Sequence, residues 1–282
     1  MNPANLRRIC AEGLRQSANL QLEGVVEAFA AVPRELFLGE GPWQIVQPLN
    51  PAALYRMTPD TALEHIYQDV VVVIDMARQL NNGQPSLHAR LIEAAAPAPG
   101  EWVLHIGCGT GYYTAILAET VGRSGRVVAY EVEADLAARA NNLLRDWPQA
   151  HVEHGDADEV KGPFDVIYVN AGATHARAEW IAALAVGGRL ILPLTAHLPG
   201  FGPLHGVGFV IRAERQVGRW PVRIVSQIAI FDCVGARDEA AEGQLRKLLR
   251  PEVSAKIHWL QVDSHPPGEA CLLHREGFCL QS

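Results

Sequence analysis

Residues 103–112, which read VLHIGCGTGY, have an apolar run directly before three closely spaced glycines and a helix-like stretch. Glycines let the backbone turn tightly and approach a ligand, and a helix N-terminus presents unpaired N–H groups to polar or negative atoms. The spacing G-x-G-x-G differs from the G-x-G-x-x-G expected around a dinucleotide pyrophosphate. We therefore predict a cofactor cradle, with a nicotinamide-dependent oxidoreductase as the less favoured alternative.

Three polar residues follow later strands of the same predicted sheet. Glu131 closes the second strand, twenty residues after Gly111, where a carboxylate can accept both hydroxyls of a ribose. Asp156 is expected after the third strand, where it could accept a hydrogen bond from an adenine amino group. Asn170 ends the fourth strand and is expected to face the reacting end of the cofactor. A turn aspartate and a strand cap are the simpler interpretations of the last two.

A second group of polar residues lies upstream of the glycines. His88 is a candidate general base because imidazole titrates near neutrality, although a helix histidine packed beneath the cofactor is an equally good interpretation. Asn82 and Gln84 could orient a second substrate through amide hydrogen bonds, but Asn82-Gly83 is also an ordinary turn dipeptide. These three residues are the catalytic candidates.

The histidines and cysteines do not predict a metal site. His151 with His154, and the set formed by His265, Cys271, His274 and Cys279, lack a recognised zinc spacing with paired ligands. Cys108 lies inside the glycine turn without a visible partner base, so a nucleophilic role is not indicated. We expect no metal.

The elements that must position these residues form an alternating pattern. Strands are predicted at 102–106, 127–130, 165–169 and 189–192, and helical faces recur at 113–121 and 136–144. Short apolar runs alternating with helices predict an α/β fold with a mostly parallel sheet covered on both faces.

The flanking segments differ from this pattern. Leu22, Val25, Val26 and Phe29 share one helical face, whereas 40–61 contains four prolines and is predicted to be irregular, wrapping over the rest of the chain. Further on, strands are predicted at 207–211 and 228–231, a helix at 242–249, and a hairpin or paired strands at 270–280.

Composition restricts the class of protein. With 282 residues, of which 49% are hydrophobic, the chain can bury a sizeable core. A net charge of −7 argues against nucleic acid as the main partner, and we find no run of about 18 apolar residues for a membrane span and no apolar signal core. Five scattered cysteines favour reduced thiols. We expect a cytoplasmic protein.

Several ordered motifs resemble one family. Residues 32–37 (VPRELF), 67–69 (YQD), 83–89 (GQPSLHA), 103–112 and 185–190 (AVGGRL) are similar to segments of class I methyltransferases, and among these of protein-L-isoaspartate O-methyltransferases. The resemblance covers roughly 20–231. It implies S-adenosylmethionine as cofactor and methyl transfer to a carboxylate of a peptide or protein. The alternatives are methylation of a small-molecule hydroxyl and an inactive module that only binds the cofactor.

The resemblance also implies the cofactor residues and the organisation of the chain. The predicted fold is a Rossmann-like methyltransferase sheet at 100–235, with an N-terminal helical and irregular cap at 1–99 that contributes to the acceptor cleft, and a C-terminal extension at 236–282 that continues a β-rich addition. The predicted cofactor-binding residues are His105, Gly107, Cys108, Gly109, Gly111, Tyr112, Glu131, Val132, Asp156, Ala157 and Asn170.

Two positions depart from the family pattern. Gly83 stands where the family carries an active-site Ser or Thr, so a hydroxyl associated with the acceptor is missing. His105 replaces an acidic residue common in the first strand, although a histidine can also hydrogen-bond the amino-acid end of the cofactor. Because of these departures, the sequence does not predict that the protein methylates isoaspartyl residues for repair.

Overall fold

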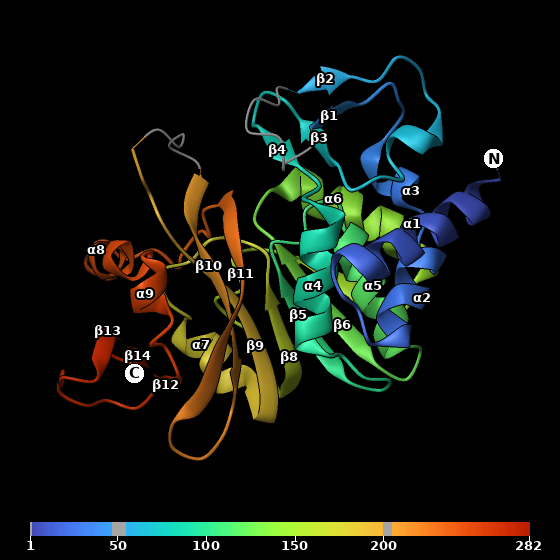
Figure 1. Cartoon of the computed structure of the whole chain (residues 1–282). Coiled ribbons are helices and arrows are strands. Elements are labelled where there is room, and N and C mark those ends of the chain that lie inside the picture. Colours follow the sequence, from blue (N-terminus) through green and yellow to red (C-terminus); the bar gives the residue numbers. More distant parts are fainter. Residues whose placement is uncertain (1, 47–54, 200–204) are drawn as a thin grey trace.

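The protein has a large central sheet with helices on both faces and a smaller sheet at one end (Figure 1). The structure, a computed structural model, describes residues 2–46, 55–199 and 205–282. The first helix and the last strand lie at opposite ends of the molecule (Figure 1).

The large sheet has ten strands in the order β13-β14-β12-β11-β10-β9-β8-β5-β6-β7. Strands β5 to β9 pair in parallel, and all later pairs are antiparallel. The strands are β5 Trp102–Ile106, β6 Arg126–Glu131, β7 Ala150–His154, β8 Phe164–Val169, β9 Leu184–Ala196, β10 His205–Glu214, β11 Trp220–Phe231, β12 Trp259–Gln261, β13 Cys271–Arg275 and β14 Phe278–Gln281.

The parallel strands are buried on both faces because successive side chains alternate between two apolar cores. In β8, Val166 and Tyr168 pack into one core, whereas Ile167 and Val169 pack into the other. A strand covered on both faces has no polar side to expose, which explains the near-continuous apolar runs that predicted it.

Helices cover the sheet in two groups (Figure 1). Helices α1, α2, α4, α5 and α6 contribute to the first core, and α7, α8 and α9 pack against the second. The helices are α1 Pro3–Ser17, α2 Glu23–Ala31, α3 Arg34–Leu38, α4 Pro85–Ala95, α5 Tyr112–Val121, α6 Ala134–Leu143, α7 Ala178–Ala183, α8 Glu239–Leu248 and α9 Pro251–Ser254, with the single-turn 3-10 helices η1 Leu63–His65 and η2 Leu144–Asp146.

A small sheet of four strands lies above α4 and α6 in Figure 1. Its strands are β1 Gln44–Val46, β2 Arg56–Met57, β3 Val71–Asp75 and β4 Leu80–Asn81, in the order β2-β1-β3-β4. Buried Trp43, Ile45, Ile66 and Val72 give this sheet its own apolar cluster. The prediction of an irregular segment at 40–61 is therefore wrong for β1 and β2, while 47–54 lie outside the described residues.

The other predicted elements are confirmed. The four central strands, the helices at 113–121 and 136–144 and the α/β class all agree with the structure. The predicted hairpin at 270–280 is the pair β13–β14, which joins the large sheet through β12 and β11. The C-terminal extension therefore continues the same sheet. The division of the chain into three segments at 99 and 235 stays a prediction.

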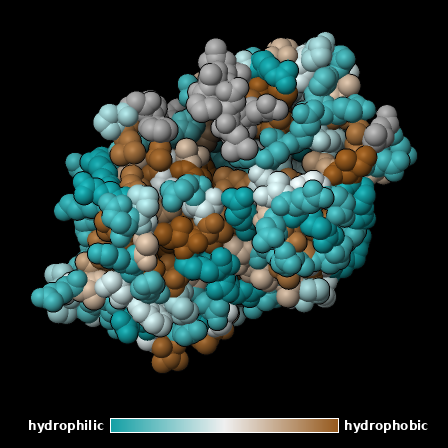
Figure 2. Space-filling view, viewed as in Figure 1, coloured by the Kyte–Doolittle hydropathy of each residue, from teal (hydrophilic) through white to brown (hydrophobic). Residues whose placement is uncertain are grey.

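The distribution of residues on the surface is that of a protein whose apolar side chains are mostly buried. On the face in Figure 2, hydrophilic residues predominate and hydrophobic residues appear in separate small groups, a normal distribution for a globular protein. Within the three described ranges, no helix combines the length and apolar character that a membrane span needs.

Candidate functional site

The glycine turn between β5 and α5 has the backbone that its sequence predicts. Gly107, Gly109 and Gly111 have φ values of +77°, +57° and +92°, a region in which side chains are strained. A Cβ on Gly107 would lie 3.2 Å from the carbonyl oxygen of Asn170, and one on Gly111 would lie 3.1 Å from Cδ1 of Leu144. Glycine is therefore required here both for conformation and for close packing.

Glu131 holds the turn from the end of the neighbouring strand. Its Oε2 accepts a hydrogen bond from the backbone N–H of Gly109 at 2.6 Å, and its Oε1 accepts one from Glu133 at 3.1 Å. Burial raises the pKa of the Glu131 carboxyl, and the N–H donors of Glu133 and Gly109 oppose that rise. An ionised carboxylate has about four acceptor positions, so capacity remains for ligand hydroxyls.

A cavity of about 400 Å³ opens beside this carboxylate at the carboxyl ends of the parallel strands. This is the edge at which open α/β sheets bind ligands. We call it the first cavity. Its lining includes Ile106, Gly107, Gly109, Tyr130, Glu131, Val132, Leu136, Gly155, Asp156, Asn170 and Ala171.

Two of the predicted polar residues are fixed in the wall of the first cavity. Asp156 Oδ2 accepts a hydrogen bond from Arg177 Nη1 at 2.9 Å, an ion pair that the sequence did not predict. Asn170 Nδ2 donates to the carbonyl oxygen of Gly107 at 3.1 Å. Each side chain is thus held by the protein before a ligand arrives.

A second cavity of about 570 Å³ adjoins the first. We call it the second cavity. Gly109, Asn170, Asn81, Ile74 and Phe231 line both, so the two cavities meet at the glycine turn. Its other lining residues include Tyr55, Asp69, Asn82, Gly83, Gln84, Ser86, His88, Cys108, Tyr112, Tyr113 and the 226–230 part of β11.

Asp69 organises the polar wall of the second cavity. Its Oδ1 accepts from the backbone N–H of Ser86 at 2.8 Å, and its Oδ2 accepts from Ser86 Oγ and Gln84 Nε2, both at 2.7 Å. Ser86 lies in the first turn of α4, where unpaired N–H groups favour a negative charge. One carboxylate therefore holds the predicted Gln84 and the start of α4 together.

Buried Arg34 fixes the 66–70 segment, which places Asp69 beside the start of α4. Its guanidinium donates to the carbonyl oxygens of Ile66 at 2.6 Å and Val70 at 2.8 Å, and Nε donates to Asn82 Oδ1 at 3.3 Å. The side chain is 1% exposed. A buried guanidinium paired with backbone carbonyls fixes a loop that has no regular ladder of its own. Asn82 is thus tied to Arg34 as well as to the second cavity.

His88 is packed inside the protein at the base of the second cavity. Nδ1 is 2.8 Å from the Tyr168 hydroxyl, and the ring stacks on Tyr113 with centroids 3.7 Å apart. Burial lowers the pKa of His88 to about 3, with His105 and Arg34 adding to the effect. A neutral, enclosed imidazole fits the packing interpretation better than that of a general base.

The remaining predicted cofactor residues divide into two groups. Cys108 and Tyr112 line the second cavity and Val132 lines the first. Gly111, His105 and Ala157 line neither cavity. His105 is fully buried on β5, where Nδ1 pairs with Thr114 Oγ1 at 2.9 Å, and the carbonyl of buried Ala157 accepts from Trp180. Burial also raises the pKa of the Cys108 thiol, which suits a packed residue.

Sequence reasoning missed Asp69, Ser86 and the wall formed by β11. Asp69 had a signal, since it closes the YQD motif, but no chemistry was attached to it. The strand at 228–231 was predicted, but its position beside the glycine turn was not, because a strand pattern does not show which distant segments its side chains face.

Residues 55–199 match the family described as Protein-L-isoaspartate(D-aspartate) O-methyltransferase (PCMT). The Protein-L-isoaspartate O-methyltransferase of Ignicoccus hospitalis is 30% identical over 228 residues, covering 77% of this chain and 94% of the relative. The chain belongs to the protein-L-isoaspartate O-methyltransferase family.

Another relative agrees with this membership, and two solved structures have the same fold. Protein-L-isoaspartate O-methyltransferase 2 of Archaeoglobus fulgidus is 32% identical over 193 residues, covering 67% of this chain and 78% of the relative. A solved protein-L-isoaspartate O-methyltransferase has a TM-score of 0.67 at 24% identity, covering 86% of this chain and 70% of that one. A Plasmodium falciparum protein, a putative member solved with S-adenosyl-L-homocysteine, has a TM-score of 0.59 at 17% identity, covering 80% and 97%. Both structures confirm the predicted fold.

In this member of the protein-L-isoaspartate O-methyltransferase family, Gly83 lies directly beside the imidazole of His88. Gly83 has a φ of +71°, and a Cβ there would overlap the imidazole of His88. The His88 ring thus occupies the space that a serine side chain would enter. A side chain at position 83 would therefore require the His88 ring to move.

Proposed function

We propose that this protein transfers a methyl group from S-adenosylmethionine to a carboxylate of a peptide or protein, forming a methyl ester. The observation that carries the proposal is the meeting of the two cavities at Gly109 and Asn170. A cofactor in the first cavity and an acceptor in the second would have their reacting ends at this junction. The family membership supports the same reaction.

The residues of the first cavity fit the cofactor. S-adenosylmethionine supplies a methyl group activated on a sulfonium. Glu131 would accept hydrogen bonds from the ribose hydroxyls, Asp156 would accept from the adenine amino group, and Asn170 would lie near the reacting methyl. Gly107 and Gly109 have positive φ values and no side chain, so a ligand could approach their backbone closely.

A carboxylate acceptor suits the chemistry of the second cavity. Carboxyl groups have an ordinary pKa of about 4, so the acceptor is already ionised at neutral pH and needs no general base. A hydroxyl acceptor does need one, and His88, with a pKa of about 3, is enclosed by Tyr113 and Tyr168. The hydroxyl alternative therefore lacks a suitable base at the position that the sequence suggested.

Catalysis on this account is mainly positioning. An in-line displacement requires the acceptor oxygen, methyl carbon and sulfur to be nearly collinear, and orientation alone can supply roughly 7–11 kcal/mol in favourable cases. Gln84 and Ser86, both held by Asp69, would orient the acceptor through hydrogen bonds. Tyr112 and Ile230, which line the second cavity, would help exclude water.

Transfer of a labelled methyl group to matched peptides tests the proposal. The protein is incubated with methyl-labelled S-adenosylmethionine and one peptide sequence carrying isoaspartate, aspartate or asparagine, each amidated at its C-terminus. We expect base-labile label in a carboxylate peptide and none in the asparagine control. The rate should be nearly independent of pH above 6, because the acceptor is fully ionised there.

Two results contradict the proposal. Base-stable label on a hydroxyl substrate, with a rate that rises through neutrality, would assign the reaction to hydroxyl methylation. Tight cofactor binding without label in any carboxylate peptide or in small acids would instead indicate a module that only binds.

A further inference from the structure

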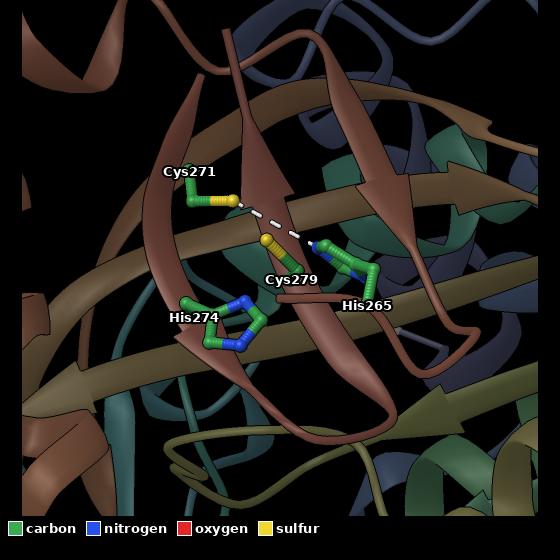
Figure 3. A group of neighbouring side chains, drawn as sticks. All are labelled: His265, Cys271, His274 and Cys279. Atoms are coloured by element: carbon green, nitrogen blue, oxygen red, sulfur yellow. Dashed lines mark hydrogen bonds between the residues drawn. The ribbon is translucent and has the colours of Figure 1, made fainter. Parts of the chain in front are cut away.

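The C-terminal extension gathers two histidines and two cysteines that the proposed function does not use (Figure 3). Cys271 and His274 lie on β13, Cys279 lies on β14, and His265 lies in the loop between β12 and β13. Figure 3 shows the four side chains grouped together beside the β13–β14 hairpin. In the described part of the chain, no residue of 236–282 lines either cavity, so the cluster is separate from the proposed active site.

The spacing of the four groups matches a tetrahedral metal site. One donor atom from each residue can be chosen so that all four lie within 4.8 Å of one another. Zinc bonds of about 2.3 Å to sulfur and 2.0–2.1 Å to nitrogen would put tetrahedral donors roughly 3.3–3.8 Å apart. Cys271 Sγ and His265 Nε2 already lie 3.8 Å apart. The remaining donor atoms need shifts on the order of 1 Å to reach tetrahedral spacing.

The histidines have lone pairs available for a metal. The ring of His265 pairs through Nδ1 with the backbone carbonyl of Asp263 at 3.0 Å. A carbonyl on Nδ1 requires the proton there, so the neutral ring has its lone pair on Nε2, which is the common arrangement for a ligating histidine. Nδ1 of His274 is buried and has no hydrogen-bond partner among the described residues. A buried nitrogen of this kind needs an explanation, and a metal bond supplies one.

Two hydrogen-bond donors lie near the cysteine sulfurs. The backbone N–H of Gly268 donates to Cys271 Sγ at 3.3 Å. The amide Nε2 of Gln281 lies 3.8 Å from Cys279 Sγ and 4.0 Å from Cys271 Sγ, and the same amide donates to Gln261 Oε1 at 2.6 Å. Donors directed at sulfur favour thiolates, and such groups in the outer shell orient metal ligands.

We propose that His265, Cys271, His274 and Cys279 bind one Zn²⁺ ion. Two thiolates and two neutral imidazoles are the donor set of structural zinc sites, and together they balance the charge of the ion. Four protein ligands leave no open position, so the site is structural. It joins the loop after β12 to the β13–β14 hairpin at the outer edge of the large sheet.

The sequence alone predicted no metal site, because the spacing of these four residues along the chain is unfamiliar. The linear order is His-x5-Cys-x2-His-x4-Cys, which lacks the paired spacing of familiar zinc motifs. The hairpin brings His274 opposite Cys279, and Cys271 lies opposite Gln281, two positions from Cys279. Strand pairing therefore creates a proximity that a search of linear spacing does not detect.

Metal content of the purified full-length protein tests the site. We expect about one zinc per chain, and visible d–d bands of a tetrahedral thiolate site after exchange with Co²⁺. The double variant Cys271→Ser, Cys279→Ser should retain less than about one tenth of the zinc, while the control Cys10→Ser, outside the cluster, should keep it all. A chelator should lower the Tm of the wild-type protein, and added Zn²⁺ should restore it.

Two outcomes overturn the proposal, and both come from the wild-type protein, so they do not depend on how a variant folds. One is protein that lacks zinc after growth in zinc-replete medium and fails to bind Zn²⁺ or Co²⁺ in titration under reducing conditions. The other is a Cys271–Cys279 disulfide in protein that was purified without reductant and that contains no bound metal. Neither outcome bears on methyl transfer, so this proposal and the proposed function fail independently.

Discussion

Glu131→Gln is expected to weaken S-adenosylmethionine binding by about 1–3 kcal/mol, which is roughly 5- to 150-fold in Kd. The carboxylate accepts backbone N–H groups from Gly109 and Glu133, and glutamine would direct its amide donors at one of them. Ribose hydroxyls would also lose their charged acceptor. Calorimetric titration of the cofactor into wild type and variant measures the difference.

A matched control separates this effect from a general loss of negative charge. Glu153 is half-exposed on β7, pairs with His151 and lines neither cavity, so Glu153→Gln should leave the Kd unchanged. Burial raises the pKa of Glu131, so wild-type affinity should fall on acidification at a higher pH than for an exposed glutamate. Equal affinity of the Glu131 variant and wild type would contradict the assigned ribose contact.

Asp69→Asn is expected to reduce kcat by about 100-fold while leaving cofactor affinity unchanged. Asp69 accepts three hydrogen bonds, from the Ser86 N–H, the Ser86 hydroxyl and Gln84. Asparagine offers one acceptor oxygen, so Gln84 and the start of α4 lose their fixed position at the acceptor cavity. Steady-state kinetics with an unmethylated carboxylate peptide as acceptor, together with cofactor titration, measures both effects.

Asp69 acts through other residues, so its test must distinguish positioning from unfolding. The control is Asp60→Asn, since Asp60 lies in the same N-terminal region, pairs with His65 and Ala62, and lines neither cavity. It should retain wild-type kcat. Asp69→Glu keeps both acceptor oxygens and should recover part of the rate. If Asp69→Asn lowers the cofactor affinity and the Tm together with kcat, a specific role of Asp69 in positioning the acceptor is contradicted.

The residues around the first cavity could be predicted to lie together because their sequence signals are local. A buried strand, a glycine turn and a helix follow one another in 103–121, and the acid that faces them ends the next strand. Short parallel units of this kind fix their own geometry, since each strand end returns to the same edge of the sheet. Gly107, Glu131, Asp156 and Asn170 lie together in the wall of the first cavity, and their contacts with the cofactor stay a prediction.

The acceptor half was less predictable because distant segments build it. Asp69 reaches α4 only because Arg34, on another helix, holds the 66–70 loop by its carbonyl oxygens. The strand that carries His105 was predicted, but the surroundings of its side chain were not. Alternation directs this side chain into the core, toward Thr114. The His265 cluster likewise depends on strand pairing and not on spacing along the chain.

The most direct test of the account is a crystal structure of this protein with S-adenosyl-L-homocysteine. We expect the ribose hydroxyls on Glu131, the adenine near Asp156, and the sulfur directed at the junction of the two cavities beside Asn170. A ligand bound elsewhere, or a first cavity that stays empty at saturating concentration, would contradict the proposed cofactor site and the reaction derived from it.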